Sequence, residues 1–166
     1  GSRYARDASK RLVVTVEPAI LDDLKKKADD YRPRDVFDFR SFTATRLEVT
    51  RGASTVAFER TTDKDGAATW RQVQPAKEVE SSSVLAALGA LSGLSVERYV
   101  DAKTRTGADA PVAVVTAAFD EGKKTERVAF GKVGDEVFAV REGEPGGAKV
   151  DAARFDEALK ALDAVK

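Results

Sequence analysis

The sequence predicts an α+β fold in which antiparallel sheet meanders carry three helices on one face. Strand-like segments with alternating apolar residues follow one another in blocks, and helical segments separate these blocks instead of alternating with single strands. Short turn sequences join the strands within each block. The chain has 166 residues, 42% of them hydrophobic, which suffices for one domain or for two small repeated modules that share one core.

Two strands and one helix are predicted in the first 30 residues. Residues 4–6 are strand-like, and the β-branched run from Leu12 to Val16 predicts the second strand. Pro18 marks the first helical position, because a proline there loses no hydrogen bond. The apolar face of this helix consists of Ile20, Leu21 and Leu24. Arg32-Pro33 breaks the helix, since the residue before a proline disfavours the helical conformation.

A three-stranded antiparallel meander is predicted next. Its strands alternate in polarity and cover residues 44–51, 54–61 and 67–74. A tight turn at Asp65-Gly66 joins the last two strands, because Asp-Gly favours the positive φ angles of hairpin turns. Three phenylalanines that precede the meander are expected to fold back onto the core: Phe37, Phe39 and Phe42.

The second half of the chain begins with a helix and ends with one. A serine among Ser81, Ser82 and Ser83 is expected to cap the first of these helices, and Gly93 to close it. The strands between the two helices are predicted over residues 96–100, 112–119, 125–130, 136–141 and 149–150. Asp151 then caps the last helix. The narrow apolar stripe that docks this helix on the core consists of Phe155, Leu159, Leu162 and Val165.

The order strand, strand, turn, helix occurs at both ends of the chain, which indicates an internal repeat. Residues 16–26 align without gaps with residues 150–160. The identical pairs are Val16 and Val150, Ala19 and Ala153, Asp22 and Asp156, and Lys26 and Lys160. We therefore expect residues 3–30 to be the C-terminal half of a preceding module and residues 31–166 to be one complete module. The Gly1-Ser2 start is typical of an expression scar.

Composition excludes several classes of function. The 28 basic residues are balanced by 28 acidic ones, so the basic surplus of a nucleic-acid binder is missing. Cysteine is absent, which removes disulfides and thiolate chemistry, and histidine is absent, which removes the commonest general base and metal ligand. No apolar stretch is long enough to insert into a membrane. We therefore expect no enzymatic activity, no metal and no cofactor, although an enzyme that uses carboxylates alone stays open.

Four residues are candidates for a binding site: Arg34, Asp35, Trp70 and Asp109. The loop that contains Arg34 and Asp35 could bind a ligand, or its Arg–Asp pair could bridge two modules. Trp70 is the single tryptophan and is more typical of a core residue beneath a helix than of a stacking platform. In the alternative function, binding of a small molecule or a glycan, an exposed Trp70 would line the site together with the loops at Arg34 and Asp109.

Other polar motifs have structural interpretations. Asp22-Asp23 and Asp29-Asp30 each point in different directions along a helix, which predicts a solvated face instead of a cation site. The stretch from Asp63 to Gly66 predicts a hairpin turn instead of a calcium loop, because no glutamate follows at the required distance. The serines of residues 81–83 lie in no known nucleophile motif and have no histidine to activate them.

Several segments, in their order, resemble a known bacterial family. Arg34–Phe39 resembles its charged opening, Trp70–Pro75 its Trp-to-Pro strand, and Leu85–Val100 its leucine-rich helix followed by a strand. Gly107–Pro111 resembles its Gly-Leu-Asp-x-Pro turn, with Ala108 in place of leucine. The second half matches its pattern at Gly131 and at Phe138-Ala139. On these residues the chain resembles domain-of-unknown-function family 4340 over roughly residues 31–166.

The resemblance implies a place in the cell envelope. Members of this family have an upstream membrane helix and an extracytoplasmic array, and some are associated with ABC-type transport systems of the gliding-motility kind. The resemblance thus implies a periplasmic or envelope-side module of a membrane-anchored parent, with subunits of a membrane complex as protein partners. It transfers no active site. Our first functional hypothesis is therefore a non-enzymatic structural or interaction module.

Overall fold

A computed structural model of the chain describes residues 3–62 and 68–166. The chain divides into two compact units, unit 1 from Gly1 to Pro33 and unit 2 from Arg34 to Lys166. The predicted expression scar at Gly1-Ser2 and the predicted turn at Asp65-Gly66 lie outside the described residues. The assignment of residues 3–30 to a preceding module stays a prediction.

Unit 1 consists of one antiparallel hairpin and two short helices. The hairpin pairs β1 (Arg3–Asp7) with β2 (Leu12–Val16), which confirms both predicted strands. The helix α1 (Pro18–Lys25) begins at the predicted proline, and the 3-10 helix η1 (Ala28–Tyr31) follows it. A two-stranded ribbon offers too little surface to bury a helix, and no residue of α1 is buried.

Unit 2 is built on a nine-stranded sheet in which every neighbouring pair is antiparallel. Its strands are β3 (Ala44–Arg51), β4 (Ser54–Thr62), β5 (Ala68–Gln74), β6 (Ala76–Lys77), β7 (Val96–Val100), β8 (Ala113–Phe119), β9 (Lys124–Val133), β10 (Glu136–Arg141) and β11 (Gly147–Val150). They lie side by side in the order β6-β5-β4-β3-β8-β9-β10-β11-β7. The α+β prediction and the predicted meander β3-β4-β5 are therefore confirmed.

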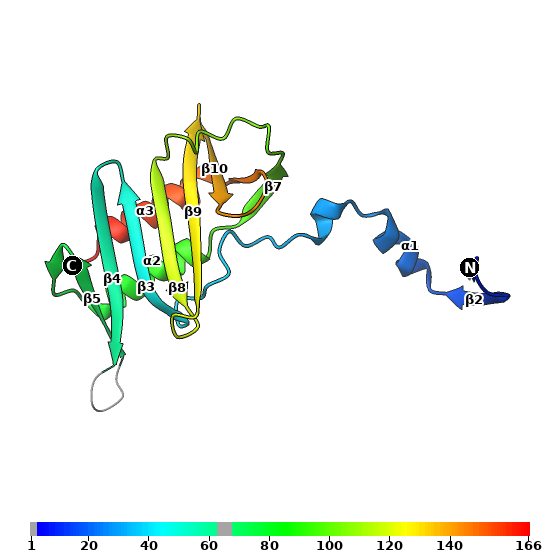
Figure 1. The fold of residues 1–166 in the computed structure, drawn as a ribbon, viewed down its shortest axis with the longest axis horizontal. Coiled ribbons are helices and arrows are strands. Elements are labelled where there is room, and N and C mark those ends of the chain that lie inside the picture. Colours follow the sequence, from blue (N-terminus) through cyan, green and yellow to red (C-terminus); the bar gives the residue numbers. More distant parts are fainter. Residues whose placement is uncertain (1–2, 63–67) are drawn as a thin grey trace. The chain divides into compact units, whose positions relative to one another are not determined.

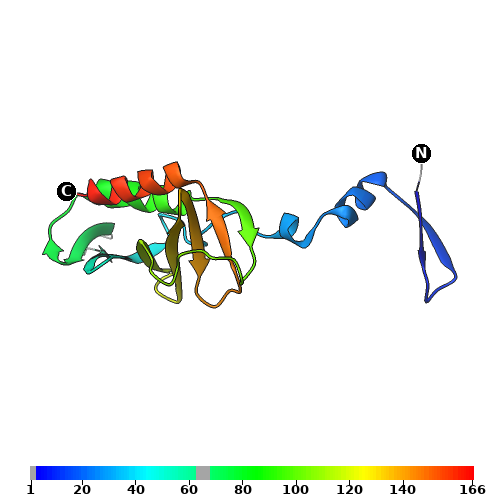
Figure 2. The same cartoon turned by 90° about the horizontal axis from the view of Figure 1, so that it is seen from above.

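Two helices cover one face of this sheet. They are α2 (Ser81–Ser92) and α3 (Ala152–Asp163), which pack against each other on the same side of the strands (Figures 1 and 2). Asp151 caps α3 as predicted, because its side chain accepts a hydrogen bond from the Arg154 N–H at 3.0 Å. The three predicted α-helices are present, but only α2 and α3 pack on the nine-stranded sheet, since α1 belongs to unit 1 and buries no residue.

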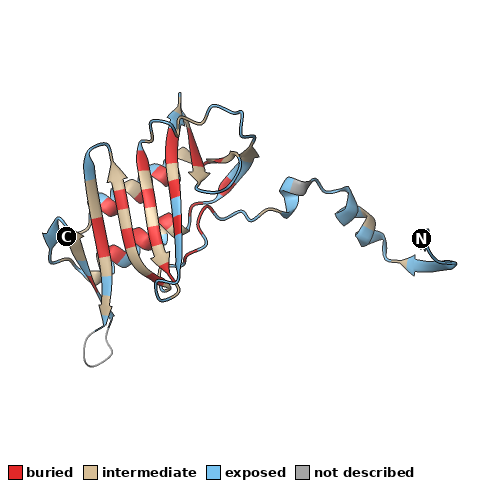
Figure 3. Ribbon diagram, viewed as in Figure 1, coloured by how far each residue is buried: buried red, intermediate tan, exposed pale blue. Residues whose placement is uncertain are grey.

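The core lies between the sheet and these two helices. Alternate residues of the central strands are buried, as the stripes along the strands in Figure 3 show. From the helices, Leu88, Leu91 and Phe155 are fully buried, and the Phe155 ring stacks on Phe130 of β9 with 4.7 Å between centroids. The helices thus bury the apolar face that the alternation in the sequence predicts.

The cap of α2 differs from the prediction. The N-cap residue is Glu80, and its side chain makes no capping hydrogen bond. The Ser81 hydroxyl instead accepts a hydrogen bond from the backbone N–H of Trp70 at 2.9 Å, which joins α2 to β5. The serine cap prediction is wrong because the Trp70 N–H, which is remote in the sequence, takes the acceptor that a local cap would need. Gly93 closes the helix as predicted.

Candidate functional site

Arg34 and Asp35 lie beside β7, at one edge of the sheet. The Arg34 guanidinium donates to the Glu97 carbonyl at 3.2 Å, and the Arg34 carbonyl accepts from the Val96 N–H at 2.7 Å. The Asp35 carboxylate pairs with Arg40 at 2.7 Å. Both candidate residues therefore make contacts within unit 2 that position the entry of the chain into the sheet.

Trp70 lies on β5 and is only 3% exposed. It belongs to the core cluster, so it has no open ring face on which a ligand could stack. β5 and β7 are the second and the last strands of the sheet order, so the structure does not bring Trp70 together with Arg34. This burial removes the stacking group on which the hypothesis of a small-molecule or glycan site depended.

Asp109 is exposed on the loop between β7 and β8. Gly107 in the same loop has a φ of +71°, and a Cβ there would lie 2.6 Å from the Lys132 carbonyl oxygen. A Cβ on Gly131 of β9 would lie 2.2 Å from the Thr106 carbonyl oxygen. The loop backbone thus lies directly on β9, and the glycines of this motif serve close packing.

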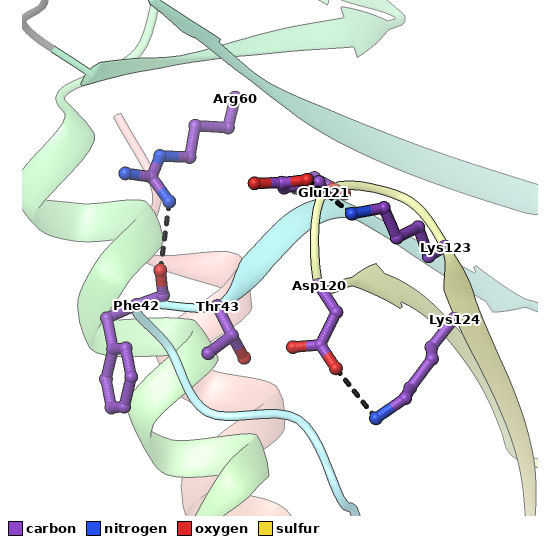
Figure 4. A pocket seen from close by; sticks show the side chains of 8 residues that line it. Phe42, Thr43, Arg60, Asp120, Glu121, Lys123 and Lys124 are labelled. Atoms are coloured by element: carbon purple, nitrogen blue, oxygen red, sulfur yellow. Dashed lines mark hydrogen bonds and ion pairs between the residues drawn. The ribbon is translucent and has the colours of Figure 1, made fainter.

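Residues that the sequence analysis did not consider for a binding site surround an open cavity of about 560 Å³ at one end of the central strands (Figure 4). Its lining residues are Phe42, Thr43, Thr45, Arg60, Asp120, Glu121, Lys123 and Lys124. They come from the turn before β3 and its start, from β4, from the turn that joins β8 to β9, and from the first residue of β9. The cavity is the best candidate for a binding site because it gathers an exposed aromatic ring and several charges.

Phe42 corrects the expectation that three phenylalanines fold into the core. Phe37 and Phe39 are fully buried, whereas Phe42 is 72% exposed. Phe42 lies in a turn where the N–H groups of Thr43 and Ala44 both donate to the Arg40 carbonyl, at 2.9 and 3.1 Å. This turn leaves the Phe42 side chain outside the core. The Arg60 guanidinium donates to the Phe42 carbonyl at 2.9 Å and fixes the backbone of this residue.

The turn between β8 and β9 has an unusual backbone. Asp120 and Glu121 have φ angles of 52° and 60°, a region that side chains other than that of glycine rarely adopt. The Gly122 N–H donates to the Phe119 carbonyl at 3.1 Å, and the Asp120 N–H donates to the Thr43 carbonyl at 3.2 Å. Two such residues in succession store strain, and strain of this kind collects at ligand clamps and switch regions.

We expect Glu121→Gly to raise the free energy of unfolding by about 1 kcal/mol, because glycine adopts a positive φ without the steric cost of a side chain. Lys123→Gly is the matched control at the same turn. It removes the other half of the same ion pair from a residue that has no positive φ, and we expect it to lower stability. Urea unfolding of both variants measures the difference, and equal shifts would contradict strain at Glu121.

The charged residues of the cavity are paired with one another. Lys124 lies 2.8 Å from Asp120, and Lys123 lies 2.6 Å from Glu121 (Figure 4). The hydrogen bond and the charge of Asp120 raise the pKa of Lys124. Lys124 therefore stays cationic at neutral pH, and the rim of the cavity has both acidic and basic side chains.

A second polar cluster lies beside this cavity and holds the first segment of unit 2, residues 36–39, against the sheet. Glu126 of β9 is buried, and its carboxylate accepts the backbone N–H groups of Asp38 and Phe39 at 3.0 and 2.9 Å. Arg141 donates to the Asp38 carboxylate and to the Val36 carbonyl, both at 2.8 Å, and lies 3.7 Å from Glu126. Burial lowers the pKa of Arg141, but the hydrogen bond and charge of Asp38 outweigh it and raise the pKa overall.

Two features are absent from the described part of the chain, a metal-binding cluster and a membrane-spanning helix. Within residues 3–62 and 68–166, no group of three or more Asp or Glu side chains gathers closely enough to hold a metal ion. In the same ranges, no helix has the length and apolar character needed to cross a membrane. What the cavity does offer is an exposed aromatic ring beside two ion pairs, which suits recognition of another molecule.

A sequence model of the family described as "Domain of unknown function (DUF4340)" matches residues 1–113, more than half of the chain. The match includes unit 1 and ends at the first residue of β8, whereas the resemblance above was placed on residues 31–166. No curated protein and no solved structure gives a significant match. On the strength of the family match, the chain belongs to the DUF4340 family.

Proposed function

We propose that this chain is a non-enzymatic interaction module that binds a protein partner at the cavity beside Phe42. The observation that carries the proposal is the 72% exposure of this ring next to a strained turn. Protein interfaces place an aromatic anchor at the centre and polar groups around it. Phe42 would serve as the anchor, with the ion pairs of Lys123 and Lys124 to one side of it (Figure 4), and the partner would offer an apolar pocket flanked by charges.

The cellular setting follows from the family resemblance alone. We propose that the module acts on the envelope side of a bacterial membrane-anchored protein, and that its partners are subunits of a membrane complex of the ABC-transport or gliding-motility kind. Fractionation of the native host tests this setting. Recovery of the native protein in the soluble cytoplasmic fraction alone would contradict it.

An affinity capture from detergent-solubilised envelope tests the binding surface. The full chain serves as bait in three forms: unaltered, Phe42→Ala, and Leu85→Ala. Leu85 of α2 is a matched control because it is also an exposed apolar residue and does not line the cavity. We expect Phe42→Ala to lower recovery of a defined partner at least about tenfold, which corresponds to about 1.4 kcal/mol, and Leu85→Ala to leave it unchanged. Equal recovery by all three baits would contradict the proposal.

A further inference from the structure

Unit 1 and the end of unit 2 share one hairpin register. In unit 1, Tyr4 pairs with Thr15 and Ala5 with Val14. Adding 134 to each number gives pairs that unit 2 also has, Phe138 with Lys149 and Ala139 with Ala148. The same shift relates the N-cap residues Glu17 and Asp151 and the first helical residues Pro18 and Ala152. The two segments therefore agree in strand pairing and in helix start, features that sequence identity alone does not fix.

The equivalent residues differ sharply in burial. Phe138 is 2% exposed and Ala158 is fully buried, whereas their counterparts Tyr4 and Leu24 are 73% and 76% exposed. Val14 is also exposed, and its counterpart Ala148 is buried. A lone two-stranded hairpin is marginally stable in water. Unit 1 thus presents, uncovered, the surfaces that its counterpart in unit 2 buries.

Unit 2 shows which elements cover these surfaces. There β9 pairs with β10, β7 pairs with β11, and α2 packs on α3. We propose that unit 1 is the closing hairpin and helix for a separate protein module of the same pattern as residues 34–135. Such a module would place a β9-like strand beside β1, a β7-like strand beside β2 and an α2-like helix against α1. The inference is independent of the cavity at Phe42.

Charge complementarity supports this partner. In unit 2, Asp156 of α3 pairs with Lys132 of β9 at 3.4 Å. Its counterpart Asp22 is exposed and, among the described residues, pairs with Lys25 of the same helix at 3.5 Å. A β9-like strand beside β1 would bring a lysine at the position of Lys132 toward Asp22. In unit 2 the corresponding positions are occupied by β10, β11 and α3 of that unit.

The test joins a second copy of residues 34–135 ahead of Ser2 in the full chain. Ser2 is the counterpart of Glu136 under the 134-residue shift, so unit 1 follows the added module where β10 would. Hydrogen exchange of the amides in β1, β2 and α1 is compared between the joined chain and the unaltered chain. We expect exchange of these amides to slow at least about hundredfold in the joined chain. Exchange at the same rate in both chains would overturn the proposal.

Two neighbouring residues of α1 provide matched variants. Leu21 corresponds to Phe155, which is fully buried, and Ile20 corresponds to Arg154, which is exposed. In the joined chain we expect Leu21→Asp to abolish the slowed exchange and Ile20→Asp to preserve it. If both variants had the same effect, nonspecific hydrophobic contact would explain the slowed exchange. That result would overturn the proposed correspondence between α1 and α3.

The unaltered chain supplies the last control. Light scattering should give the mass of a monomer, with fast exchange in unit 1. A doubled mass together with slow exchange in unit 1 would identify a second copy of the whole chain as the occupant, and would overturn the assignment of an incomplete module.

Discussion

Glu126→Leu is expected to destabilise unit 2 by about 4 kcal/mol. Leucine fills a similar volume at this buried position. It lacks the carboxylate that accepts the N–H groups of Asp38 and Phe39. Each backbone donor left unbonded in the interior costs about 1–3 kcal/mol, and the loss of one partner from a buried ion pair costs about 3–5 kcal/mol. Arg141 would also lose one of its carboxylate neighbours.

Two variants separate this effect from a general loss of charge. Glu126→Gln keeps one acceptor oxygen in nearly the same shape, so we expect an intermediate loss. Glu157→Leu removes an exposed carboxylate from α3, and we expect a change within about 0.5 kcal/mol. Urea unfolding followed by the fluorescence of Trp70, the single tryptophan, reports all three variants. A loss below about 1 kcal/mol for Glu126→Leu would mean that the segment from Val36 to Phe39 is held by other contacts.

Gly131→Ala should be the second most damaging single change. A Cβ at this position would lie 2.2 Å from the Thr106 carbonyl oxygen and 2.5 Å from the Ala108 nitrogen. These are backbone atoms, so no side-chain rotation relieves the clash, and the loop between β7 and β8 must move away from β9. Overpacking of this kind costs about 1–3 kcal/mol, and we expect the upper end of that range.

The same substitution at Gly89 provides a control of opposite sign. Gly89 lies in α2, and a Cβ there would meet no atom within 4 Å. Alanine favours a helix over glycine by about 1 kcal/mol, so Gly89→Ala should stabilise unit 2 by up to that amount. Thermal and urea unfolding of both variants measure the contrast. Two shifts of the same sign would contradict the close contact of the loop with β9.

The strands and helices follow from local patterns in the sequence. The β-branched run at β2, the alternation along β3 and the aspartate before α3 each identify an element from a few neighbouring residues. Such signals carry over to the structure because hydrogen bonding within a hairpin or a helix is local. The exception is the serine predicted to cap α2, because its acceptor bonds to Trp70, 11 residues earlier in the chain.

The candidate site could not be predicted in the same way. The cavity joins Phe42, Arg60 and Asp120, which belong to separate segments, and the pairing of β3 with both β4 and β8 brings them together. Of the four candidate residues, Trp70 is buried, Asp109 is exposed on a loop, and Arg34 and Asp35 position the chain beside β7. The sequence identifies residues whose side chains could bind a partner, but their burial and their neighbours in the fold decide which of them are accessible to one.

The sequence by itself determined the α+β class, the element boundaries to within a few residues and the absence of histidine and cysteine chemistry. The tertiary structure alone decided that Phe42 points outward, that Glu126 is buried as an acceptor, and that unit 1 leaves its apolar side chains uncovered. The physical reason is the range of the interactions. Propensity and periodicity act over a few residues, whereas burial depends on segments that lie far apart in the chain and meet only in the fold.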